Sequence, residues 1–355
     1  MQHLCTEPYL ISSFGRNRVE KDKIKPRSNS IDVLKGIAAL LVCYQHAYGT
    51  YGISDYILAI SRIAVPLFVM ITGFFYYSTV NKHREIIQIK KFTRIAVEMV
   101  LLYFFIDSIK NIFTGQAISY WNKCFNLLNI VRFALLNDPI HADHSWYMWA
   151  MIYILVFAWK FSNLWKYKCV RRSIIMLTCF GLPFLSKYIF LIDANANIDP
   201  NLYRNFLIPI AAYFFLGIEC WEKKEKIQKV GTSNWILVAT ISMVCIFLEK
   251  YILSALEIDR LSGSYFFSMP LAIAVFGIAL SSCWKNKVFS VIATFGRKYS
   301  LIFYIIHPLF SRIEYKIFDM NSLQQYLGYI FVVLGSLTFS ILYVTMKEKR
   351  GIKRS

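Results

Sequence analysis

Apolar runs of about twenty residues recur along almost the whole chain. An α-helix of this length spans the hydrocarbon core of a bilayer, and the runs lack the alternation of about ten residues that marks an outer-membrane barrel. Of the 355 residues, 57% are hydrophobic, and the mean hydropathy is +0.45. These values exclude an ordinary soluble domain. The sequence therefore predicts an all-α, polytopic integral membrane protein.

Hydropathy predicts about ten transmembrane helices, and the basic residues predict that the N- and C-termini are cytoplasmic, because most Lys and Arg fall in alternate connections. We expect a basic N-terminal tail over 1–29, a transmembrane domain over 30–346 and a basic C-terminal tail over 347–355. The expected spans are 31–50, 55–78, 93–113, 145–162, 173–192, 203–221, 233–252, 264–283, 299–315 and 325–346.

The formal net charge of +19 is divided among short clusters between the apolar runs. This distribution is typical of cytoplasmic loops and argues against nucleic acid as a partner. We expect membrane lipids as partners and a multi-pass location in the plasma (inner) membrane. The eight cysteines contain no CxxC pair, so we expect neither a metal site nor a disulfide framework.

The first span carries ionisable residues where burial is costly. Asp32, Lys35 and His46 share one face of a helix that turns about 100° per residue, and His46 lies roughly 16 Å from Lys35 along the axis. Ionisable groups at membrane depth are usually functional. A lone helical histidine is more often a packed residue, but these neighbours, with Tyr44 in support, favour a neutral imidazole that acts as general base. We place Asp32 with His46 in catalysis; the alternative for Asp32 is a simple pair with Lys35.

The third span begins with two cations and a carboxylate on one helix face, namely Lys91, Arg94 and Glu98. They could be juxtamembrane anchors that reach lipid phosphates. Alternatively, they form an anion site. In such a site the planar guanidinium of Arg94 binds a phosphate through two hydrogen bonds, and Glu98 orients that guanidinium. Such a site at the inner face, together with Lys35, suits a nucleotide diphosphate.

At the outer start of the fourth span, His144, Trp146 and Tyr147 form a third candidate motif. The two aromatic residues suit an interfacial belt at least as well as a sugar. His141 and Asp143 lie close to His144, but loop spacing of this kind is a weak metal signal, and we predict no metal site.

Other polar features have plainer interpretations. Arg62, in the second span, is a further candidate functional residue. Gly73 permits close helix packing or an opening. For His307 we weigh an outer polar group against a helix-end residue and favour the latter. The pairs 249–250 and 259–260 are interpreted as solvated loop charges.

Taken together, these motifs resemble the membrane-bound acyltransferase-3 family. The resemblance rests on Lys35 and His46 with ten residues between them, the segment VPLFVMITGFF, the Lys91-x-x-Arg94 pair and the segment HSWYMWAMIY, and it covers about residues 28 to 346. The family's more common arginine is replaced by lysine at 35 and 91, and its serine-glycine by Thr72-Gly73.

The resemblance implies transfer of an acyl group, usually acetyl, from cytoplasmic acyl-CoA to a sugar or related acceptor bound from the other side. It places the essential histidine at His46 and the donor-binding pair at Lys91 and Arg94. It implies acetyl-CoA as cosubstrate and no permanently bound cofactor. The partners expected are therefore acyl-CoA and a glycan or lipid-linked saccharide, with His144, Trp146, Tyr147 and Arg62 as candidates for the acceptor side. The alternative is a non-catalytic amino-acid (serine) transporter or binding module, like the membrane half of a membrane-bound serine racemase.

Overall fold

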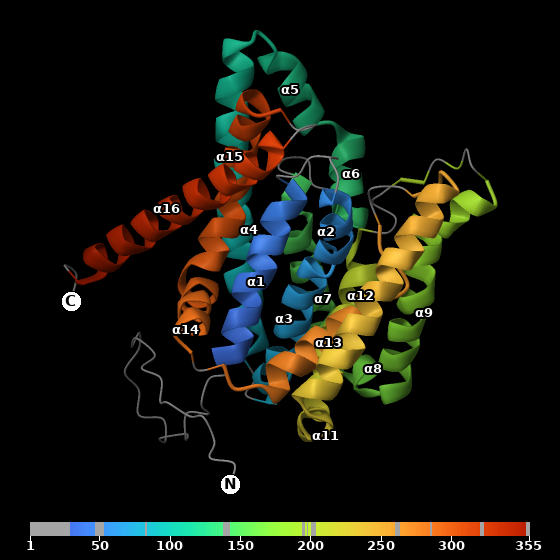
Figure 1. The fold of residues 1–355 in the computed structure, drawn as a ribbon. Coiled ribbons are helices and arrows are strands. Elements are labelled where there is room, and N and C mark those ends of the chain that lie inside the picture. The colour runs from blue at the N-terminus through green and yellow to red at the C-terminus, as the bar shows by residue number, and fades with distance from the viewer. Residues whose placement is uncertain are drawn as a thin grey trace.

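The computed structural model describes residues 29–46, 53–81, 84–137, 143–193, 196, 198–199, 204–259, 263–284, 286–319 and 323–352. These residues form a bundle of helices with no strand among them, and α1 lies in its centre (Figure 1). The elements in chain order are α1 (Asn29–His46), α2 (Ser54–Ser61), α3 (Ala64–Asn81), α4 (Glu85–Phe113), α5 (Ala117–Cys124), α6 (Leu127–Leu136), η1 (Asp143–Ser145), α7 (Trp146–Lys160), α8 (Ser162–Lys166), α9 (Lys168–Ser186), η2 (Tyr188–Leu191), η4 (Phe206–Ile210), α10 (Ala211–Glu222), α11 (Lys224–Val230), α12 (Thr232–Ala255), α13 (Ser268–Ser281), α14 (Lys287–Thr294), η5 (Phe295–Tyr299), α15 (Ser300–Ile317) and α16 (Gln324–Ile352).

The all-helical prediction is confirmed for the described residues, and a helix lies over each predicted span. Five helical stretches are long and apolar enough to cross a membrane, whereas the total of about ten crossings and the orientation stay predictions. The five stretches are Ser54–Tyr77, Lys168–Ser186, Thr232–Ala255, Lys287–Ile317 and Gln324–Gly351.

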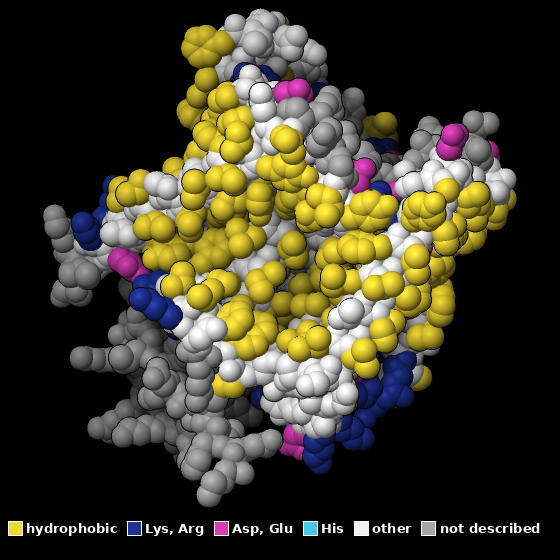
Figure 2. Space-filling model, viewed as in Figure 1, with side chains coloured by type: hydrophobic (Ala, Val, Ile, Leu, Met, Phe, Trp, Pro, Cys, Tyr) yellow, Lys and Arg dark blue, Asp and Glu magenta, His cyan; other side chains and the backbone are white. Residues whose placement is uncertain are grey.

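The outer surface of the bundle is strongly apolar. Figure 2 shows hydrophobic side chains across the face between α16 and α12, while Lys and Arg gather near its lower edge and at the end of α16. Leu237 and Ile241 on α12, and Leu334 and Leu342 on α16, are among the exposed apolar residues. Soluble monomers rarely expose apolar patches of this extent, so this surface is that of a membrane protein.

The central helix α1 packs against α3, α14, α15 and η5. Residues Lys287–Ile317 form one helical run that contains a π-helical turn at η5. Asp32 on α1 pairs with Arg297 of this run, and His46 lies beside its His307. The same run therefore borders both ends of α1.

One cysteine differs from the sequence expectation. Cys283 is disulfide-bonded, whereas the scattered cysteines predicted no disulfide framework. Free thiols are found at Cys43, Cys124, Cys169, Cys179, Cys220 and Cys245.

Helices α3 and α10 meet through two glycines. A Cβ atom on Gly73 would lie 2.0 Å from the carbonyl oxygen of Phe214, and one on Gly217 would lie 2.2 Å from that of Met70. Each glycine thus allows the backbone of the other helix to approach closely, as the sequence predicted for Gly73.

We expect Gly73→Ala to destabilise the fold by at least about 1–3 kcal/mol, because the added methyl group must push α3 away from α10. The measurement is thermal unfolding in detergent, followed by intrinsic fluorescence. Gly181→Ala is the matched control, since nothing lies within 4 Å of its Cβ position. Equal unfolding midpoints for the two variants would contradict the prediction.

Candidate functional site

Three histidines from three elements meet at the end of α1. The ring centroid of His46, the last residue of α1, lies 5.3 Å from that of His307 on α15 and 6.4 Å from that of His144 in η1. The centroids of His144 and His307 are 6.1 Å apart. Tyr103 and Tyr304 complete the cluster, with centroids 4.7 Å and 6.1 Å from that of His144. The structure therefore brings His46 and His144 together, as candidate residues of one site.

His307 was wrongly interpreted as a helix-end residue. It lies inside α15 and is fully buried. Its Nδ1 is 3.2 Å from the carbonyl oxygen of Phe303. A carbonyl can only accept a hydrogen bond, so Nδ1 carries the proton and Nε2 is left as an acceptor. Nε2 is buried and has no hydrogen-bond partner in the structure. Nε2 of His307 is therefore a buried hydrogen-bond acceptor that lacks a donor.

The spacing between His46 and His307 suits a hydrogen bond. Two imidazoles joined by an N–H···N bond of about 2.9 Å have centroids about 5 Å apart, because each nitrogen lies about 1.1 Å from its ring centroid. The observed separation is 5.3 Å. A small rotation of His46 would satisfy Nε2 of His307 and leave the second nitrogen of His46 for another group.

A cleft opens beside the histidine cluster. It encloses about 610 Å³, including its open mouth, and its walls include Gln45, Arg62, Trp146 and Arg204. Arg62 and Arg204 both interact electrostatically with His46. Gln45 donates a hydrogen bond to the carbonyl oxygen of Ser61, 2.7 Å away, which ties the end of α1 to α2. The cleft therefore joins two predicted acceptor-side residues, Arg62 and Trp146, to the surroundings of His46.

Two other candidates from the sequence are buried in packing. The Tyr147 ring lies 6.3 Å from that of Phe68 and 5.9 Å from that of Tyr304, and the residue is only 7% exposed. Tyr44 donates a hydrogen bond to the carbonyl oxygen of Ser54. Tyr44 thus helps to position the end of α1, while Tyr147 packs behind the histidine cluster.

The start of α1 holds a second polar cluster. Lys35 Nζ lies 3.6 Å from Asp32 Oδ1, and Arg297 Nε lies 3.8 Å from Asp32 Oδ2. Asp32 itself is 1% exposed. Asp32 therefore pairs with Lys35, which was the alternative interpretation, and Arg297 adds a cation that the sequence analysis did not single out.

The predicted anion site on α4 is on the surface. Arg94 and Glu98 form an ion pair of 2.7 Å between side chains that are 80% and 60% exposed. Lys91 is also exposed. Glu98 thus pairs with Arg94, and their part in binding a donor stays a prediction. Helix α4 packs mainly against α7, whereas the Asp32 cluster is formed by α1 and η5.

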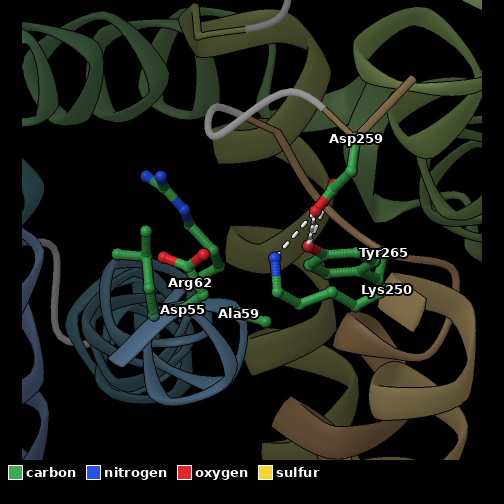
Figure 3. Close-up of a pocket in the computed structure, with 7 residues that line it drawn as sticks. Asp55, Ala59, Arg62, Lys250, Asp259 and Tyr265 are labelled. Atoms are coloured by element: carbon green, nitrogen blue, oxygen red, sulfur yellow. Dashed lines mark hydrogen bonds and ion pairs between the residues drawn. The ribbon is translucent and has the colours of Figure 1, made fainter. Parts of the chain in front are cut away.

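A buried ionic network lies on the other side of Arg62 from the cleft. Lys250 and Tyr265 both contact Asp259, and Arg62 points away from this carboxylate (Figure 3). Asp259 Oδ1 is 2.6 Å from Lys187 Nζ, and Oδ2 is 2.8 Å from Lys250 Nζ. Glu249 accepts hydrogen bonds from the Tyr188 hydroxyl and the Phe266 backbone N–H.

The expectation that Glu249, Lys250 and Asp259 are solvated was therefore wrong. Glu249 and Lys250 are buried, and the side chain of Asp259 is only 6% exposed, because Lys187 and the loop before α13 close over them. Arg260 and His141 lie outside the described residues.

Comparison with known proteins identifies relatives over most of the chain. A family model described as an acyltransferase domain matches residues 28–345. An amino-acid racemase of Enterococcus faecalis is 24% identical over 361 residues, which cover 93% of this chain and 48% of the racemase. A second amino-acid racemase of that organism is 26% identical over 277 residues, which cover 73% of this chain and 37% of the racemase. The chain thus matches less than half the length of either relative. No solved structure matches it.

Asp259→Asn should destabilise the protein by about 3–5 kcal/mol at neutral pH, because it leaves two buried lysines without their carboxylate. Burial raises the pKa of Asp259, but the charges and hydrogen bonds of Lys187 and Lys250 outweigh it and hold the pKa below its usual value. The stabilisation is therefore complete above the unfolded-state pKa of about 3.9 and is lost as the pH falls through the folded-state value.

The measurement compares thermal unfolding of both proteins between pH 5 and 8, where the difference should stay constant. Glu257→Gln, an exposed carboxylate in the same loop, is the control and should have little effect. A difference that disappears at pH 7, or one that grows toward pH 3, would refute this role of Asp259.

Proposed function

Because the chain belongs to the acyltransferase-3 family, we propose that it is an integral-membrane O-acyltransferase. In this proposal it moves an acyl group, most simply acetyl, from cytoplasmic acyl-CoA to a hydroxyl of a cell-envelope glycan or related acceptor at the plasma membrane. The observation that carries the proposal is the position of His46, whose ring lies 5.3 Å from that of a histidine with an unsatisfied acceptor nitrogen and which follows Gln45, a residue that lines an open cleft.

His46 acts as the general base in this reaction. One ring nitrogen takes the proton of the acceptor hydroxyl while the hydroxyl oxygen attacks the thioester carbonyl. The other ring nitrogen donates a hydrogen bond to Nε2 of His307. This bond fixes the orientation of the His46 imidazole, as the third residue of a catalytic triad orients the base. When the C–S bond breaks, the proton returns to the departing thiolate. His144 and the tyrosines around it limit water near the reacting groups.

The donor is held at the other end of α1. Lys35, with Arg297 beside it, supplies positive charge there, and Lys91 and Arg94 supply exposed cations on α4. Phosphate groups of acyl-CoA suit such cations, and Arg94, already oriented by Glu98, offers the bidentate geometry. The predicted cytoplasmic orientation of this end agrees with the location of acyl-CoA.

A second candidate function is amino-acid binding or transport without acyl transfer. It is favoured by the names of the two relatives, which are amino-acid racemases. Uptake of labelled L-serine by vesicles containing the chain, in the absence of acyl-CoA, would support this candidate. Acetylation of envelope glycan would support the first.

His46→Ala should reduce acetyl transfer by about 10²–10⁴-fold, the usual contribution of a general base. The assay follows label from acetyl-CoA into envelope polysaccharide, using the purified chain in nanodiscs. The unfolding midpoint of the variant shows whether the fold is intact. Transfer at the wild-type rate by folded His46→Ala would eliminate the proposed role.

Arg94→Ala should raise KM for acetyl-CoA about tenfold or more with little change in kcat, because a charge-assisted hydrogen bond contributes about 1.5–3 kcal/mol. Lys91→Ala should act in the same direction. Lys90→Ala is the matched control, since it removes an exposed lysine from the neighbouring position on the same helix. If all three variants shift KM equally, the effect is general surface charge and no specific donor site is present.

A further inference from the structure

Glu314 is a buried carboxyl group in the second half of α15. The residue is 0% exposed, and neither Oε1 nor Oε2 has a hydrogen-bond partner. In the part of the chain that the structure describes, no Lys or Arg forms an ion pair with it. A buried carboxylate without hydrogen bonds or a counterion is strongly destabilising, and a carboxyl group in such surroundings takes up a proton and becomes neutral.

We propose that Glu314 is a proton-binding site between α15 and α16, and that the bound proton stabilises the contact between these two helices. When the O–H bond of the carboxyl group breaks, the proton passes to water and a negative charge stays in the contact. This inference goes beyond the proposed function and does not depend on acyl transfer.

The carboxyl group lies directly against α16. A Cβ atom on Gly328 would lie 2.5 Å from Oε1 and 3.1 Å from the carboxyl carbon of Glu314. Gly328 therefore allows the carboxyl group to reach the backbone of α16. Helix α16 packs mainly against α15 and extends to the edge of the bundle (Figure 1). A charge on Glu314 would thus lie in the contact that attaches α16.

Ser311 supplies a hydrogen-bond acceptor for the bound proton. It precedes Glu314 by three residues, so the two side chains are neighbours on one face of α15. Ser311 is 4% exposed, and its Oγ also lacks a hydrogen-bond partner. A neutral carboxyl group has one O–H donor, which a serine oxygen can accept. A rotation of the two side chains would therefore pair them inside the helix contact.

The groups that face Glu314 from other helices are not positively charged ones. Cys43 on α1 interacts electrostatically with Glu314, and Tyr329 lies beside the contact on α16. A thiol and a phenol are ordinarily neutral at neutral pH. Arg312, two residues earlier on α15, pairs with Asp107 of α4. These described groups would leave a carboxylate at position 314 without a counterion.

A proton fits this position better than a metal ion does. Hard cations such as Ca²⁺ take about six or more oxygen ligands in proteins. Within the described residues, no group of three or more His, Cys, Asp or Glu side chains could hold a metal ion. A proton needs only the carboxyl oxygen that binds it and one acceptor, and Ser311 provides that acceptor.

Infrared spectroscopy of the full chain at pH 7 tests the proposal, in dodecyl maltoside, a detergent without carbonyl groups. The wild type should show the C=O stretching band of a neutral carboxylic acid, and Glu314→Gln should lose this band. Glu348→Gln is the matched control and should retain it, because Glu348 is an exposed glutamate on α16. The band should be the same in sodium buffer and in choline buffer.

A bound proton also makes stability depend on pH. The folded wild type holds a proton that the unfolded chain releases above a pH of about 4.3, so stability falls as the pH rises. Between pH 5 and 7, the folding equilibrium constant of the wild type should fall by up to about tenfold per pH unit relative to Glu314→Gln. Denaturant unfolding of both proteins in the same detergent measures this change.

Three results would each overturn the proposal: no Glu314-dependent band at pH 7, loss of the band on addition of sodium, or a stability difference that stays constant between pH 5 and 7. Glu314→Met, which is also neutral and of similar size, replaces Glu314→Gln if that variant does not fold. Failure of both neutral variants to fold would overturn the proposal as well, because a carboxyl group that is already neutral tolerates a neutral replacement. Neither measurement contains acyl-CoA, so both outcomes are independent of acetyl transfer.

Discussion

The arrangement of this protein depends on the close contact between α1 and the helical run Lys287–Ile317. A Cβ atom on Gly296 would lie 1.9 Å from the carbonyl oxygen of Asp32, so the π-helical turn can touch α1 only with glycine at that position. Further along, Ala39 and Cys43 pack with Phe303 in a buried cluster. Because the two helices stay in contact over this length, His307 comes to lie beside His46. A wider separation of α1 and η5 at Gly296 would therefore also change the distance between His46 and His307.

Several buried charges in this bundle are matched locally. Asp32 lies between Lys35 and Arg297, Asp259 lies between two lysines, and Arg171 reaches Glu219 and Glu222 with 2.7 Å contacts. An unpaired ion in such surroundings would cost several kcal/mol. The pairs hold helix ends together.

The sequence was sufficient for the helices and for the residues at the ends of α1. Hydropathy and helical periodicity act over one element, so they located α1 and placed Asp32, Lys35 and His46 on it. They could not show which distant residues meet. Asp259 is buried because Lys187, 72 residues away in sequence, reaches it. His307 was misjudged because Pro308 suggests a helix end, yet α15 continues past it, supported by packing on α1 and α16.

The same packing constrains any path between the two ends of α1. Ala39 and Cys43 are buried, so the face that joins Asp32 to His46 is filled by protein. An acyl chain can follow that face only if α1 separates from Lys287–Ile317, and the glycine contact makes that separation costly. Ile37 and Leu41, on another side of α1, are only half-buried. A path over this side of α1 would displace fewer packed side chains than a path along the buried face. The half-buried side of α1 is thus the less costly route toward His46 from the start of the helix.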